Sequence, residues 1–196
     1  MAVAQNSNGV KPLRERPLDF AYFLFFALHI PATLLIDLQA LYPQSLVPGI
    51  IAQLPKFYIS MSKDPLISGA FSGSDAFIWF RTFLTLEAIF QLPVFVLGMR
   101  GLLRGSRAIY VLLLIYGAST ATTTLPCIAV VFTTPITSAE TVAANIASIS
   151  AEQRLLLLTS YIPFFLMPLL ITVDMASRVL TLVREGERVS KAAKSR

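Results

Sequence analysis

Long apolar stretches alternate with short polar ones along this chain. Four of the apolar stretches approach the roughly 20 residues that an α-helix needs to cross a bilayer. We expect these spans at about residues 18–38, 77–99, 108–132 and 155–173. The stretches are unbroken, whereas a strand of a membrane β-barrel alternates over ~10 residues. The pattern therefore predicts an all-α integral membrane protein built as a four-helix transmembrane bundle.

Prolines lie well inside each predicted span, at Pro31, Pro93, Pro126, Pro163 and Pro168. Each proline removes a backbone hydrogen bond and bends its helix. We therefore expect proline-kinked helices with space between them. The first loop, at about 39–76, is long and carries apolar residues, which predicts one or two short interfacial helices at that end of the bundle.

The positive charges indicate how the bundle is oriented. We divide the chain into an N-terminal tail (1–16), a membrane domain (17–175) and a basic C-terminal tail (176–196). Four spans place both termini on one side, and twelve of the sixteen Lys and Arg residues lie there or in the second loop. The positive-inside rule then predicts that both termini are cytosolic.

The composition excludes several other classes of protein. Of the 196 residues, 55% are hydrophobic and 14% are charged, and the mean hydropathy is +0.69. A soluble enzyme would have to expose much of this apolar surface to water. The net charge of +5 does not indicate nucleic-acid binding, because the basic residues lie between apolar blocks. The single cysteine, Cys127, offers no metal-site spacing, so we expect neither a metal nor a cofactor.

Two carboxylic acids, Asp37 and Glu87, lie within the apolar spans. An ionisable group at this depth costs several kcal/mol on insertion scales, so its presence needs a reason. Three predicted helices also carry polar residues at i, i+4 spacing, which places them on one side of a helix. These polar stripes are His29, Thr33 and Asp37; Glu87 and Gln91; and Tyr116, Thr120 and Thr124. Polar stripes facing lipid would be unsatisfied, so we expect them to line a shared buried cavity.

Simpler interpretations of these residues remain open. Asp37 fits an interfacial position in headgroup water, and Glu87 fits an interhelical hydrogen bond. His29 is also consistent with a histidine packed in the core, and the threonine hydroxyls with hydrogen bonds to the backbone of their own helix. If the two acids share a cavity, they cannot both ionise cheaply. We then hypothesise that Glu87 stays protonated and donates to an ionised Asp37, in a site for an amphiphile with a cationic amine or a hydroxyl group.

Five motifs resemble the sigma-2 receptor branch of the EXPERA superfamily, which also contains the emopamil-binding sterol isomerases. In chain order they are FLFFALHIPATLLIDLQALYP, KDPL, FIWFRTFLTLEAIFQLPVF, IYGASTATTTLP and LTSYIPFFLMP. The resemblance implies a four-helix protein of the endoplasmic reticulum membrane, and of the nuclear envelope continuous with it. It also implies cytosolic termini and an occluded intramembrane pocket for sterols and cationic amphiphilic drugs.

The same resemblance assigns roles to individual residues. It implies that Asp37 pairs with ligand amines and that Glu87 hydrogen-bonds to Asp37. Further pocket-lining positions are His29, Gln91, Thr124 and Tyr161. Asp64, followed by Pro65, is expected to support the architecture of the first loop. Ser119 and Phe164 replace a histidine and a tyrosine of the animal pattern, which makes this pocket less polar.

We expect a non-enzymatic receptor or carrier that binds a sterol or a cationic amphiphilic small molecule and acts in sterol or lipid homeostasis. Its further expected partners are the lipid bilayer, a membrane protein acting in sterol transport, and a second copy in a homodimer. One alternative is a sterol isomerase in which Glu87 delivers a proton and His29 or Asp37 receives one. The other is a membrane adaptor in quality control of precursor proteins, with the basic tail as an interaction helix.

Overall fold

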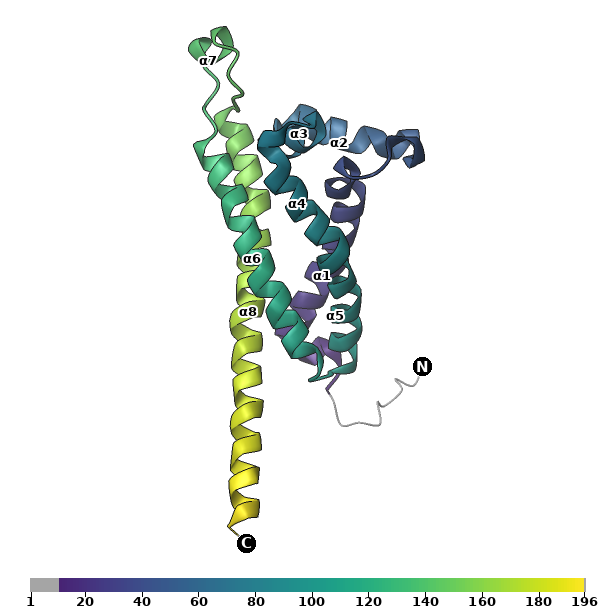
Figure 1. Ribbon diagram of the computed structural model, residues 1–196, viewed down its shortest axis with the longest axis vertical. Helices are drawn as coiled ribbons and strands as arrows, with labels where there is room; N and C mark the ends of the chain where they lie inside the picture. Colours follow the sequence, from purple (N-terminus) through teal and green to yellow (C-terminus); the bar gives the residue numbers. More distant parts are fainter. Residues whose placement is uncertain (1–10, 196) are drawn as a thin grey trace.

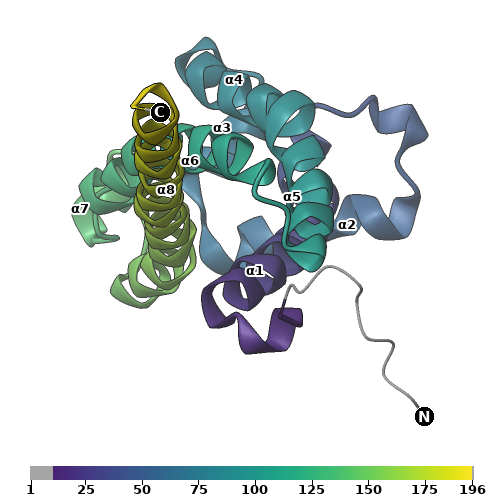
Figure 2. The ribbon, with the colours of Figure 1, turned by 90° about the horizontal axis from the view of Figure 1, so that it is seen from below.

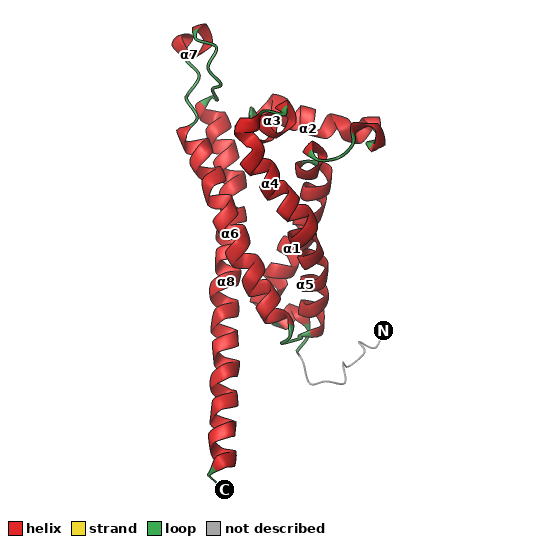
Figure 3. Cartoon of the chain, in the orientation of Figure 1, coloured by secondary structure: helices red, strands yellow, loops and turns green. Residues whose placement is uncertain are grey.

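The computed structural model describes residues 11–195, and its long elements are all helices (Figure 3). Four helical segments are long and apolar enough to cross a membrane. They are α1 (Pro17–Leu35) with the 3-10 turn η2 (Asp37–Ala40), the continuous segment Asp75–Arg104, α6 (Ile109–Thr133) and α8 (Ala151–Lys194). The predicted four-helix membrane bundle is therefore confirmed.

The second span is not one regular helix. It consists of η4 (Asp75–Phe77), α4 (Ile78–Leu86), the π-helical turn η5 (Glu87–Gln91) and α5 (Leu92–Arg104). Pro93 follows the π-turn and cannot donate a backbone hydrogen bond to Ile89, so the regular α-helical pairing is interrupted at this point. The proline expected to kink this span thus lies beside a change of helical pitch.

Helices α6 and α8 run side by side, and α1 packs against α5 (Figure 1). Figure 2, in which the bundle is seen from below, also shows α8 beside α6. Gly117 permits the close approach of α6 to α8, since a Cβ there would lie 2.6 Å from Thr172 Oγ1 and 2.7 Å from the Pro168 carbonyl oxygen. Small residues at such crossings are typical of membrane bundles, where packing drives helix association.

Among the described residues, two large apolar clusters and a smaller one around Val131, Ile149 and Leu157 hold the bundle together. The first lies between α1, α5 and α6 and centres on Tyr22, Phe26, Phe95 and Tyr116. The second lies toward the end of the bundle opposite the turn that joins α5 to α6, and it includes Leu38, Leu66, Phe80, Leu84 and Cys127. The expected short helices of the first loop are present as α2 (Gly49–Ser62) and α3 (Pro65–Ser72), which cover this end (Figure 1).

The remaining loop and the C-terminus extend beyond the bundle. The third loop forms an arm with one short helix, α7 (Ala139–Ala143). We expected a span ending near residue 173 and a separate tail from 176, but α8 continues unbroken to Lys194. No proline follows Pro168, and an Asp174–Arg178 ion pair at i, i+4 bridges the expected boundary.

Candidate ligand-binding cavity

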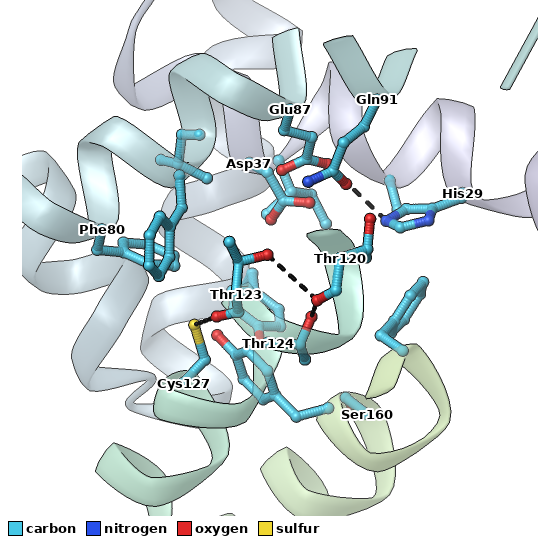
Figure 4. Close-up of a pocket in the computed structure, with 17 residues that line it drawn as sticks. His29, Asp37, Phe80, Glu87, Gln91, Thr120, Thr123, Thr124, Cys127 and Ser160 are labelled. Carbon is cyan, nitrogen blue, oxygen red and sulfur yellow. Dashed lines mark hydrogen bonds and ion pairs between the residues drawn. The ribbon is translucent and has the colours of Figure 1, made fainter. Parts of the chain in front are cut away.

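A cavity of about 260 Å³ lies within the bundle between α1, α4, α6 and α8 (Figure 4). Aromatic and aliphatic side chains form most of its wall, and polar groups project into it from several helices. All six ligand-binding residues predicted from the sequence line it: His29, Asp37, Glu87, Gln91, Thr124 and Tyr161. The fold therefore brings together side chains that lie more than a hundred positions apart in the chain.

Asp37 reaches the cavity from a break in the first span. The α-helix α1 ends at Leu35, and Asp37 begins the 3-10 turn η2, so the expected regular spacing from His29 stops before Asp37. The buried Gln39 amide donates to the backbone carbonyls of Leu35, at 2.5 Å, and Ile51, at 2.9 Å. These bonds satisfy an end carbonyl of α1 and join the turn to α2, which holds Asp37 at the cavity wall.

Glu87 and Gln91 both project into the cavity from the π-turn η5. The Thr33 hydroxyl donates to Glu87 Oε1 at 2.5 Å, and His29 Nε2 lies 3.8 Å from the same oxygen. Glu87 is thus held by two residues of α1, and Asp37 lies in the same cavity. The hydrogen bond from a protonated Glu87 to Asp37 stays a prediction.

His29 combines packing with exposure to the cavity. Its ring centroid lies 4.7 Å from that of Phe95 and 4.5 Å from that of Phe164, and the residue is 8% exposed. Among the described residues, nothing hydrogen-bonds to its Nδ1 atom. The aromatic neighbours fix the plane of the imidazole, whose Nε2 side faces Glu87.

The threonines of α6 present hydroxyl oxygens to the cavity. The Thr124 hydroxyl donates to the Thr120 carbonyl at 2.8 Å, which uses its proton and leaves its oxygen as an acceptor. Thr120 and Thr123 line the same wall. Tyr116, the first member of this stripe, does not line the cavity. It packs one turn away against Phe26 and Phe95, at centroid distances of 5.3 and 5.6 Å.

Asp64 is fully buried beside the cavity and joins three helices. Its Oδ1 accepts from the backbone N–H of Leu66 at 2.8 Å and of Ile67 at 3.2 Å, which caps α3. Its Oδ2 accepts from the hydroxyls of Tyr58 at 2.8 Å and Tyr161 at 2.9 Å. Burial and the nearby Asp64 carboxylate raise the pKa of Tyr58, so this phenol stays protonated and keeps donating. Pro65 occupies the first position of α3, where its missing N–H costs nothing.

Sequence reasoning missed several lining residues. Phe80, Phe83 and Leu84 line the cavity at helical spacing before Glu87, and this periodicity was a usable signal. Tyr58 reaches the cavity from α2, and no pattern in the sequence marks it. Phe164 forms part of the wall, whereas Ser119 does not. In residues 11–195, no group of three or more His, Cys, Asp or Glu side chains is placed to hold a metal ion.

Residues 50–175 match the family model described as EXPERA (EXPanded EBP superfamily). The chain is 33% identical to Sigma intracellular receptor 2 of Xenopus tropicalis over 161 residues, which cover 82% of this chain and 88% of that protein. It is 32% identical to Sigma intracellular receptor 2 of Homo sapiens, over 84% of this chain and 90% of the human protein. It is also 30% identical to Efficient mitochondria targeting-associated protein 19 of Saccharomyces cerevisiae, over 76% of this chain and 91% of that protein.

Proposed function

Since this chain belongs to the EXPERA family, we propose that it is a non-enzymatic membrane receptor whose cavity binds sterols and cationic amphiphilic ligands. The similarity to proteins named Sigma intracellular receptor 2 supports a receptor role. We further propose that the protein resides in the endoplasmic reticulum membrane, acts in sterol or lipid homeostasis, and has both termini in the cytosol. The twelve positive residues on the side of the termini support this orientation.

One observation carries the proposal: two carboxylic acids line an intramembrane cavity whose lining contains no Lys or Arg. A carboxylate without a cationic partner is costly at this depth, and an amine brought by a ligand would supply that partner. Phe80, Phe83 and Phe164 provide the apolar surface that a hydrophobic ligand body needs. An amphiphile with an amine at one end and an apolar body therefore matches the chemistry of the lining.

The test compares Asp37→Asn with Asp75→Asn in purified full-length protein. Asp75 is an exposed acid at the start of the second span, and it lies outside the cavity. Binding of a radiolabelled cationic amphiphile should be lost in Asp37→Asn and retained in Asp75→Asn. Unchanged affinity in Asp37→Asn would overturn the proposed pairing with the amine.

The juxtaposition of His29 and Glu87 keeps sterol isomerisation as a second candidate activity. A protonated Glu87 is suited to deliver a proton to a double bond, and His29 lies near enough to take part in proton transfer. The assay is conversion of a sterol with a nuclear double bond by the purified protein. Product above the level of a Glu87→Gln control would favour the enzyme, and equal background would favour the receptor.

The long exposed end of α8 supports a third candidate, an adaptor for other membrane or precursor proteins. The fungal relative is named for efficient mitochondria targeting, and α8 extends well beyond the bundle (Figure 1). Affinity purification of the full chain with and without a cavity ligand separates the candidates. Partners that depend on α8 and remain unchanged when the cavity is occupied would favour the adaptor.

A further inference from the structure

A second cavity, of about 430 Å³, lies at the end of the bundle from which α1 begins. It is formed by the start of α1, the turn between α5 and α6, and α8. Three arginines line it: Arg16, Arg107 and Arg178. It shares no lining residue with the ligand cavity, and its lining contains arginines where that of the ligand cavity has none, so it has a different chemistry.

Two of these arginines are held in place by other groups. Arg16 donates to the Leu102 carbonyl at 2.6 Å, to the Lys11 carbonyl at 3.1 Å and to Asp19. Arg178 donates to Asp19 Oδ1 at 2.7 Å. It also engages both carboxylate oxygens of Asp174, at 3.1 and 2.8 Å. A guanidinium has five N–H donors, so each arginine keeps N–H groups beyond the three that these bonds use.

The acids beside this cavity are already engaged by these arginines. The two oxygens of Asp19 pair with Arg16 and Arg178, and Asp19 is 4% exposed. Asp174 accepts from Arg178 and from the Tyr22 hydroxyl, which lies 3.0 Å away. Both acids are therefore neutralised by the arginines that they orient. Three arginines and two acids leave one positive charge in excess. A preorganised group of this kind binds an anion without first having to order its side chains.

Arg107 supplies the excess charge. Gly105, in the left-handed conformation with φ 60°, ends α5 and turns the chain toward α6. Arg107 lies in this turn and is exposed at the cavity. Within residues 11–195, its guanidinium has no hydrogen-bond or ion-pair partner. Its donors are thus available to a ligand.

The position of the cavity relative to the membrane spans indicates which kind of anion it binds. Arg16 lies just before the first span, and Arg107 lies between the second and third spans, so the cavity is at the level of the bilayer surface. Leu18 also lines it and is 42% exposed, which offers an apolar contact beside the cations. We propose that this cavity binds the phosphate group of an anionic phospholipid headgroup. Guanidinium groups match phosphate geometry through paired N–H donors, and basic pockets at membrane surfaces favour anionic lipids.

The test uses purified full-length protein in detergent, with dioctanoyl phosphatidic acid and dioctanoyl phosphatidylcholine as probes in native mass spectrometry. The variant Arg107→Gln is compared with Arg104→Gln. Arg104 is an exposed arginine at the end of α5 that does not line the cavity, so each variant removes one charge from the same end of the bundle. We expect Arg107→Gln to weaken binding of phosphatidic acid by about tenfold, and Arg104→Gln to change it by less than about twofold.

Two results would overturn the proposal. Equal losses in both variants would show that the lipid senses only the general charge of this surface. Equal binding of the two lipids by the unaltered protein would show that the cavity does not prefer an anionic headgroup to a zwitterionic one. Inorganic phosphate, added at the same concentration as the lipid, tests whether the cavity binds a lipid headgroup or a free phosphate ion. If inorganic phosphate fails to displace phosphatidic acid, the proposal of a lipid site is supported. Full displacement would overturn it and indicate a site for soluble phosphate. None of these outcomes depends on the ligand of the first cavity.

Discussion

The surroundings of two pairs of acids differ between the two cavities. Asp19 and Asp174, at the end of the bundle where α1 begins, are paired with arginines and a tyrosine hydroxyl. Asp37 and Glu87, within the bundle, have no Lys or Arg in the lining around them. In the first region both acids are paired with cations inside the protein, which stabilises the helix ends. In the second region the proposed ligand would supply the cation. The difference between the two regions indicates that the partners of an acid, rather than its residue type, decide its role.

Asp64 represents a third case, in which uncharged donors surround a buried acid. It accepts hydrogen bonds from two tyrosine hydroxyls and two backbone N–H groups. Its role is therefore structural, although it lies close to the ligand cavity. If the partners of each acid decide its role, the loss of stability on substitution should follow the number of partners lost.

Asp64→Ala should cause the largest loss of stability. The substitution removes a helix cap and leaves buried donors of Tyr58 and Tyr161 without an acceptor, which together cost about 4 kcal/mol. Thermal unfolding of the purified protein in detergent measures the loss. The control is Ser74→Ala, which removes the exposed cap of η4. An equal loss in both variants would contradict the role of Asp64 as a shared acceptor.

Asp19→Asn should cause the next largest loss. It leaves Arg16 and Arg178 close together without the carboxylate that both engage, at a cost of about 3 kcal/mol. The same unfolding measurement tests this, and Glu15→Gln, at an exposed position in η1 outside this cluster, serves as the control. Stability equal to that of the control would show that the ion pairs contribute little.

Thr33→Val should have a smaller effect, because it removes one hydrogen bond to Glu87 and keeps the side-chain volume. We expect a loss of about 1 kcal/mol and a change in the affinity of a cationic amphiphile. The control is Thr122→Val, since that exposed hydroxyl donates only to the Ala118 carbonyl of its own helix. Identical ligand affinities in the two variants would show that Thr33 does not position Glu87.

Asp37→Asn should have the smallest effect on stability while removing ligand binding. Its charge has no cationic partner in the lining, so neutralising it costs less than about 0.5 kcal/mol or stabilises the unliganded protein. Unfolding temperatures measured without ligand, beside those of Asp19→Asn, check this contrast. A loss as large as that of Asp19→Asn would mean that a partner within the protein already balances Asp37.

Much of the fold and of the ligand cavity followed from the sequence. The apolar stretches predicted four spans, because the length of hydrocarbon to be crossed sets the length of each helix. Asp37, Glu87 and Gln91 stood out because a polar group in such a stretch is rare and costly. The spacing of residues within one helix indicated which of them share a side, and it grouped Glu87 with Gln91 and Thr120 with Thr124, which line the cavity. Tyr116 of the same stripe does not line it, and Tyr161 was implied by the family resemblance alone.

Only the tertiary structure decided how residues of different helices pair. Asp19 and Arg178 are 159 positions apart, and Tyr161 meets Asp64 across 97 positions. Helical spacing gives angles within one helix, whereas a contact between helices depends on their rotation, tilt and depth, which packing of the whole bundle sets. For the same reason, the sequence marked the charges at the helix ends as a topology signal. The fold showed that some of them form a second cavity.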